Sequence, residues 1–106
     1  MKNTKKNFLN SELSVEERSK EKAKFHILPI PLEKTVSCGR GTSKGPEAIL
    51  EASNELERFT GKSEPCLSGI FTHPFLNCNS PIENVMLNVE KTTKEISKQN
   101  KIPVIL

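Results

Sequence analysis

Phe25-His26-Ile27-Leu28-Pro29-Ile30-Pro31 begins the stretch that decides the fold, and the stretch continues through Ser37-Cys38-Gly39-Arg40-Gly41-Thr42-Ser43-Lys44-Gly45-Pro46-Glu47-Ala48-Ile49. Residues 25–30 form an apolar run without alternation, which is typical of a strand buried on both faces. Proline donates no N–H to a sheet, so the strand is expected to end by Pro29. Gly45-Pro46 then begins a helix, because proline suits the first helical position. The stretch is therefore predicted to be a strand, a glycine-containing loop and a helix.

Two further strands and a second helix are predicted beyond this stretch. Residues 67–71 and 102–106 are the strand candidates, and Ser80-Pro81-Ile82-Glu83 has the form of a capping box at the start of a helix. The order strand, helix, strand, helix, strand predicts an α/β fold with a parallel sheet and right-handed crossovers.

Each predicted helix has an apolar stripe that is expected to face the core. In the first helix, residues 46–60, the stripe consists of Ile49, Ala52, Leu56 and Phe59. In the second, residues 81–99, it consists of Ile82, Val85, Met86, Val89 and Ile96.

The polar, basic N-terminal arm, residues 1–24, is predicted to differ from the α/β part, residues 25–106. Residues 1–10 are expected to be disordered, and the capping box Ser14-Val15-Glu16-Glu17 predicts a short helix over residues 15–23. The net charge of +3 arises largely in this arm. Four glutamates interrupt its lysines, so we expect a solvated surface and no contact with nucleic acid.

The stretch from Ile30 to Ser53 resembles the start of the ureohydrolase domain shared by agmatinases, arginases and formimidoylglutamases, and is most similar to that of agmatinases. Gly45-Pro46, Ile49 and Ala52-Ser53 match the family pattern in order. Residues 101–106, Lys-Ile-Pro-Val-Ile-Leu, are similar to the family's third strand, which runs into a Gly-Gly-Asp-His metal-binding turn. The chain stops before that turn. It is therefore expected to be the N-terminal part of such a domain, truncated after the third strand.

The resemblance also implies a topology. In the family the first strand lies between the second and the third, so the chain moves along the sheet in one direction and then back. Right-handed crossovers in opposite directions place the two helices on opposite faces. We expect a partial doubly wound parallel sheet of three strands with a crossover helix on each face.

The chemistry that the resemblance implies is hydrolysis of a guanidino group, releasing urea, by two manganese ions that activate a bridging water. The family's ligands lie in a Gly-Gly-Asp-His turn, an Asp-x-His-x-Asp segment and an Asp-x-Asp segment. None of these occurs here, and the sequence contains no aspartate. We therefore assign no catalytic, cofactor-binding or metal-binding residue, expect no cofactor in this chain, and expect it to be inactive alone.

Two histidines were weighed as candidate metal ligands. His26 lies within the first strand, where a hydrogen-bonded structural histidine is the commoner role. His73 follows the second strand and forms, with Cys78, two ligands of a site that would need a third or fourth. A loop histidine beside Pro74 is the plainer interpretation.

The loop after the first strand offers two other possibilities. Cys38 lies near Arg40 and Lys44, which would lower a thiol pKa, but a nucleophile also needs a positioned base. The glycines between Gly39 and Gly45 precede a helix, as in phosphate-binding loops, but their spacing fits neither standard phosphate motif. By resemblance, this loop lies at the rim of the active-site face.

The remaining expectations concern location and partners. Cys38, Cys66 and Cys78 are widely spaced and odd in number, which favours a reducing cytoplasm, and no segment is apolar enough to span a bilayer. The family is homo-oligomeric, and the apolar third strand is expected to self-associate or to pair with the missing part of the domain. A small non-catalytic interaction protein and a nonfunctional product of a truncated gene are the alternatives. The guanidino substrate and the oligomeric state stay open.

Overall fold

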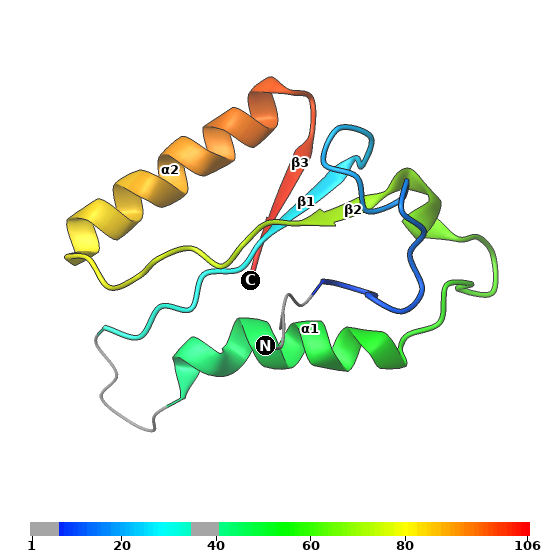
Figure 1. Cartoon of the computed structure of the whole chain (residues 1–106), viewed down its shortest axis with the longest axis horizontal. Helices are drawn as coiled ribbons and strands as arrows, with labels where there is room; N and C mark the ends of the chain where they lie inside the picture. Colours follow the sequence, from blue (N-terminus) through cyan, green and yellow to red (C-terminus); the bar gives the residue numbers. More distant parts are fainter. Residues whose placement is uncertain (1–6, 35–40) are drawn as a thin grey trace.

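Three parallel strands and two helices form the framework of the computed structural model, which describes residues 7–34 and 41–106 (Figure 1). The strands are β1 (Phe25–Leu28), β2 (Ile70–Thr72) and β3 (Ile102–Ile105), in the order β2-β1-β3. The helices are α1 (Gly45–Ala52) and α2 (Ile82–Lys98). The α/β class, the parallel sheet and the central position of the first strand are thereby confirmed.

The two helices lie on opposite sides of the sheet, as expected. Figure 1 shows α2 on one side of the strands and α1 on the other. The chain crosses from β1 to β2 and later from β2 past β1 to β3, so the two crossovers run in opposite directions. None of the helices in the described part of the chain has the length and apolar character needed to cross a bilayer.

The central strand β1 carries the sheet's buried residues. Its His26, Ile27 and Leu28 are 0%, 4% and 2% exposed. Ile27 is the register partner of Thr72 in β2 and of Val104 in β3. Because β1 has a neighbour on each side and a helix over each face, its unalternating apolar sequence matches its position.

The first helix differs from its prediction in both length and buried face. α1 ends at Ala52 and continues only as the 3₁₀ helix η2 (Ser53–Glu55). Pro46, Leu50 and Ser53 are buried, whereas Ile49, Leu56 and Phe59 are 46%, 53% and 61% exposed. The predicted stripe Ile49–Phe59 is therefore wrong.

Ser53 explains the buried face of α1. Its Oγ donates to the carbonyl of Leu50 at 2.6 Å and accepts the N–H of Leu9 at 2.9 Å. The N-terminal arm thus packs on the side of α1 that contains a serine. A serine that bonds to nearby backbone also favours the end of a helix. The local apolar periodicity of α1 could not indicate this contact between Ser53 and the distant Leu9.

The second helix matches its prediction over most of its length. Val85 and Ile96 are buried as expected, while Ile82 and Met86 are 39% and 47% exposed. The expected capping box does not form, because α2 begins at Ile82. The carbonyl of Pro81 accepts the N–H of Asn84 and of Val85, so Pro81 precedes the first helical residue and Ser80 lies one position too early to cap.

The N-terminal arm is folded onto the rest of the molecule from residue 7 onward. Leu9, Leu13 and Cys66 form a buried cluster, with Phe8 and Ile70 packed against it. The disorder expected for residues 1–10 therefore does not extend to residues 7–10, and residues 1–6 lie outside the described part of the chain. The arm contributes Phe8, Leu9 and Leu13 to this cluster.

The short helix expected over residues 15–23 does not form, and that segment consists of turns. Its capping box is present, since Ser14 Oγ accepts the N–H of Glu17 at 3.1 Å and Glu17 Oε1 accepts the N–H of Ser14 at 3.0 Å. The carbonyl of Glu17 instead accepts the N–H of Ile70 at 2.7 Å. Because the Glu17 carbonyl bonds to β2, it is not available for the hydrogen bond that it would accept within a helix.

Candidate functional site

The carboxyl ends of the three strands meet at one edge of the sheet, which is where open parallel sheets bind ligands. The carbonyl of Leu28 accepts the N–H of Leu106 at 3.1 Å, and the carbonyl of Leu106 accepts the N–H of Ile30 at 3.1 Å. The loop after β2 joins them, since Leu76 donates its N–H to the carbonyl of Pro29 at 3.0 Å. These bonds hold the loops after β1 and β2 together.

A polar pocket lies between these two loops. Its volume is about 430 Å³, and it is lined by Pro31, Glu33, Lys34, Ser43, Leu76, Asn77, Cys78 and Asn79. Neutral amides, one carboxylate and one ammonium group therefore surround it. We define this hollow as the edge pocket.

Glu33 organises the rim of the edge pocket. Its Oε1 accepts the N–H of Ser43 at 3.0 Å and of Gly41 at 3.1 Å. These donors, that of Ser43 foremost, lower the pKa of Glu33, so the side chain is a carboxylate at neutral pH. A phosphate at this turn would need the same N–H groups. In the described part of the loop, from Gly41 onward, the Glu33 carboxylate therefore takes the place that a bound phosphate would need.

The cysteines have separate environments. Cys66 is buried in the cluster with Leu9 and Leu13. Cys78 lines the edge pocket, its thiol lies 3.6 Å from the carbonyl of Leu76, and burial raises its pKa. A raised pKa disfavours the thiolate and hence nucleophilic chemistry at Cys78. Cys38 and Arg40 lie outside the described residues, so the expectation that Cys38 is an ordinary loop thiol stays a prediction.

The two histidines are neighbours, which the sequence analysis did not predict. His26 Nδ1 lies 3.0 Å from His73 Nε2, and His26 Nε2 lies 3.0 Å from the carbonyl oxygen of Lys20. The Phe71 ring packs against both imidazoles, with centroids 5.2 Å from His26 and 4.7 Å from His73. His26 is thus the hydrogen-bonded structural histidine that was expected. His73 contacts it rather than standing alone in the loop.

Burial keeps this pair neutral. It lowers the pKa of His26 and lowers the pKa of His73 to about 4, with the charges of His26 and Lys20 contributing to the shift at His73. No group of three or more histidine, cysteine or glutamate side chains able to hold a metal ion exists among residues 7–34 and 41–106. The suggested pair of His73 and Cys78 therefore gains no further ligand there.

Arg58 joins segments that are distant in sequence. Its Nη1 and Nη2 donate to the two carboxylate oxygens of Glu17 at 2.7 and 2.9 Å. Its Nε donates to Glu64 at 2.9 Å, and Nη1 also donates to the carbonyl of Glu12 at 2.8 Å. Hydrogen bonding to Arg58 lowers the pKa of Glu17 to about 2. This cluster fixes the N-terminal arm beside α1 and β2, and nothing in the local pattern around Arg58 predicted it.

Comparison with known proteins decides the family. A sequence model of the arginase family matches residues 23–106, which is most of the chain. The chain belongs to the arginase family.

Two relatives within the arginase family give the likeness more detail. The chain is 41% identical over 70 residues to the N(1)-aminopropylagmatine ureohydrolase of Synechocystis sp., a match that covers 63% of this chain and 22% of that protein. It is also similar to the crystal structure of the agmatine ureohydrolase of Thermoplasma volcanium, with a TM-score of 0.76 and 25% identity. That match covers 92% of this chain and 36% of the solved one. The chain thus spans about a fifth and about a third of these two arginase-family proteins.

The described residues do not fit the metal centre that the arginase family implies. Hard divalent ions such as Mn²⁺ prefer carboxylate oxygens at fixed geometry, and the sequence has thirteen glutamates but no aspartate. At the edge pocket the single carboxylate, Glu33, is already bonded to two backbone N–H groups. Among residues 7–34 and 41–106, this edge of the sheet therefore has loop structure and no group of side chains able to hold a metal ion.

Proposed function

We propose that this chain forms the first three strands and two helices of a ureohydrolase that releases urea from a guanidino compound of the agmatine type. The observation that carries the proposal is the fold match to an agmatine ureohydrolase over 92% of the chain. The 41% identity to an aminopropylagmatine ureohydrolase supports a substrate with an amine-bearing tail. Arginine, whose tail also carries a carboxylate, is the less favoured substrate.

The catalytic metal ions of such an enzyme would be bound outside these 106 residues. Two manganese ions would activate the attacking water, and their ligands would be aspartates and histidines that this sequence does not contain in suitable groups. We infer that the 106-residue chain alone does not release urea. Its contribution is to build one end of the sheet and the rim of the active-site face.

In this proposal the rim of the edge pocket lies near the active site of the complete enzyme. Glu33 holds the turn at Gly41 and Ser43, immediately before α1. Asn77 and Asn79 line the edge pocket beside it. Beside Lys34, such a carboxylate and two amides give the pocket hydrogen-bond acceptors and donors for a polar substrate tail.

We further propose that β3 is covered by more sheet in the complete enzyme. β3 is an edge of the three-stranded sheet, and Ile102, Val104 and Ile105 are 42%, 37% and 53% exposed. An apolar strand edge is a template for pairing with another strand. Either the rest of the domain or a second copy would bury it.

A cytoplasmic location is consistent with the free thiols of Cys66 and Cys78 and stays a prediction.

A chimeric enzyme tests the function. The 70-residue segment of the Synechocystis relative that matches this chain would be replaced by the corresponding residues of this chain. The chimera is expected to bind Mn²⁺ and to release urea from agmatine or aminopropylagmatine, with arginine a poorer substrate. The native relative and the 106-residue chain alone serve as positive and negative controls.

Two results would count against the proposal. A chimera that is folded by circular dichroism and binds Mn²⁺, yet releases urea from none of the three compounds, would refute the agmatine-type assignment. Urea release by the 106-residue chain itself would refute the inference that the metal ligands lie elsewhere. If the chain instead served only as an interaction protein, the chimera would retain no activity.

A further inference from the structure

The His26–His73 pair has a single arrangement of protons when both rings are neutral. The carbonyl of Lys20 can only accept, so His26 Nε2 carries a proton and donates it. His26 Nδ1 is then bare and accepts the Nε2–H of His73 across 3.0 Å. The bonds run in one direction, from His73 to His26 to the carbonyl of Lys20. They connect the loop after β2, the central strand and the N-terminal arm.

This arrangement can take up one proton but not two. A first proton fits on His73 Nδ1, which has no hydrogen-bond partner among the described residues, and leaves both bonds intact. A second proton would have to go to His26 Nδ1. It would set two N–H groups against each other across the 3.0 Å contact. The unfolded chain has no such restriction, and both histidines would take protons near their ordinary pKa of about 6.5.

The surroundings oppose even the first proton. Lys20 contributes a positive charge from the N-terminal arm, and Lys101 contributes another from the turn before β3. β1 and β2 carry no titratable side chain other than His26, and α2 buries only the apolar Val85 and Ile96. In the arm, Arg18 and Glu21 also line the pocket beside Phe71, and the Glu21 carboxylate accepts the hydroxyl of Ser19 at 3.2 Å.

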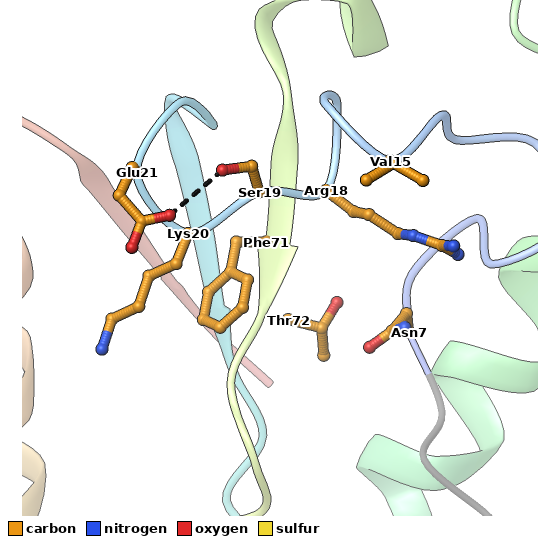
Figure 2. Close-up of a pocket in the computed structure, with 8 residues that line it drawn as sticks. All are labelled: Asn7, Val15, Arg18, Ser19, Lys20, Glu21, Phe71 and Thr72. Carbon is orange, nitrogen blue, oxygen red and sulfur yellow. Dashed lines mark hydrogen bonds between the residues drawn. The ribbon is translucent and has the colours of Figure 1, made fainter.

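The segment that would respond to these protons is the end of the arm. Figure 2 shows residues Arg18 to Glu21 together with Phe71 and Thr72 of β2, around a pocket of about 320 Å³. Two side-chain bonds fasten this segment to the sheet side: His26 to the carbonyl of Lys20, and Lys101 Nζ to the carbonyl of Glu21 at 2.6 Å. Lys24 is held separately, by backbone bonds to Ser68 and Ile102. Charge on the imidazole pair would repel Lys101 and Lys20, so it would weaken both fastenings at once.

We propose that the His26–His73 pair is a proton-sensitive latch, which holds residues 18–22 on the sheet while both imidazoles are neutral and releases them as the pair is protonated. The sign follows from the proton count. Below about pH 6.5 the opened segment binds more protons than the closed one, so the closed form loses stability as pH falls. Each extra proton changes the opening equilibrium about tenfold per pH unit. With two histidines the largest change is about a hundredfold per pH unit.

Hydrogen exchange read by mass spectrometry tests the latch on the full 106-residue chain. Exchange would be measured at low micromolar concentration from pH 7 to pH 5 and corrected for the intrinsic pH dependence of amide exchange. The opening equilibrium of residues 18–22 is expected to rise at least tenfold per pH unit below pH 6.5. That of α2 is expected to rise much less. An equal rise in both segments would indicate global unfolding and overturn the proposal.

Two variants distinguish titration from packing. In His73→Gln a side-chain amide still donates to His26 Nδ1 but takes up no proton, so the pH slope at residues 18–22 should drop to tenfold per unit or less. Phe71→Leu alters the packing around both rings and removes no titrating group, so it should keep the wild-type slope. Equal slopes in wild type and His73→Gln would overturn the proposal.

Ring-nitrogen NMR of the wild-type chain provides a check that needs no variant. Both histidines are expected to carry their proton on Nε2 at pH 7. Finding His26 as the Nδ1–H form, or finding both rings titrating independently near pH 6.5, would contradict the latch even if His73→Gln failed to fold.

Discussion

Gly69 lies so close to Ala23 that a Cβ built on it would be 2.6 Å from the Cα of Ala23. The N-terminal arm approaches the start of β2 at this point, where Lys24 donates its N–H to the carbonyl of Ser68 at 2.9 Å. Gly69 also has a φ of +90°, which side-chain-bearing residues rarely adopt. The fold of the arm therefore depends on this glycine.

Gly69→Ala is expected to destabilise the protein by more than about 2 kcal/mol, because backbone strain adds to a clash with main-chain atoms. Gly61 is the matched control, since its φ of +99° is similar but nothing lies within 4 Å of its Cβ position. Gly61→Ala should cost about 1 kcal/mol. Thermal melts followed by circular dichroism would measure both. Equal costs would mean that the contact with Ala23 is unimportant.

Leu50 and Ile49 test which face of α1 is buried. Leu50 is 1% exposed and Ile49 is 46% exposed. Leu50→Ala should cost about 2–5 kcal/mol through a cavity, whereas Ile49→Ala should cost about 0.5 kcal/mol or less. Urea denaturation gives both free energies of unfolding. A larger loss of stability in Ile49→Ala than in Leu50→Ala would mean that the face predicted from the apolar stripe is the buried one.

Glu17 should dominate the loss of stability in acid. Its pKa is lowered to about 2 by Arg58, so the folded carboxylate releases its proton more readily than the unfolded one. Its contribution is therefore complete above about pH 4.5 and is lost as pH falls toward 2. Glu17→Gln should flatten the dependence of the melting temperature on pH between 4.5 and 2. Glu16→Gln is the control, because its exposed pair with Lys22 should change that dependence little.

The open edge of β3 should make the 106-residue chain associate. Three apolar side chains on it are more than a third exposed, and burying each would contribute about 1.5–3 kcal/mol. Light scattering at rising concentration should show a growing mass. Val104→Lys should reduce the association, because a charged residue blocks edge pairing. A monodisperse wild-type monomer at high concentration would contradict the expectation.

The sheet could be predicted from sequence because its signals are local. The apolar run around Ile27, the proline that begins α1 and the long apolar stripe of α2 each indicate an element without knowledge of its neighbours. The order β2-β1-β3 came from resemblance to the family, because periodicity alone does not rank strands in a sheet.

The remaining features depend on contacts between distant segments. Leu9 reaches Ser53 over a separation of 44 residues, and Arg58 reaches Glu17 over 41. The meeting of His26 with His73 likewise follows from the register of β1 with β2, which pairs His26 with Phe71. The sequence alone does not give this register, so the contact between the two histidines could not be predicted from it. Residues 1–10 are predicted to be disordered because they are polar and lysine-rich, but Leu9 is buried against Cys66 and bonds to Ser53, both far along the chain.

Calorimetric titration of the 106-residue chain with Mn²⁺ tests most directly the claim that it supplies ureohydrolase framework without the metal centre. The chimera with the Synechocystis relative would be titrated in parallel as the positive control. We predict no binding at micromolar Mn²⁺ by the chain and clear binding by the chimera. Micromolar binding by the chain alone would contradict the account, because a metal site would then exist within these 106 residues or their self-assembly.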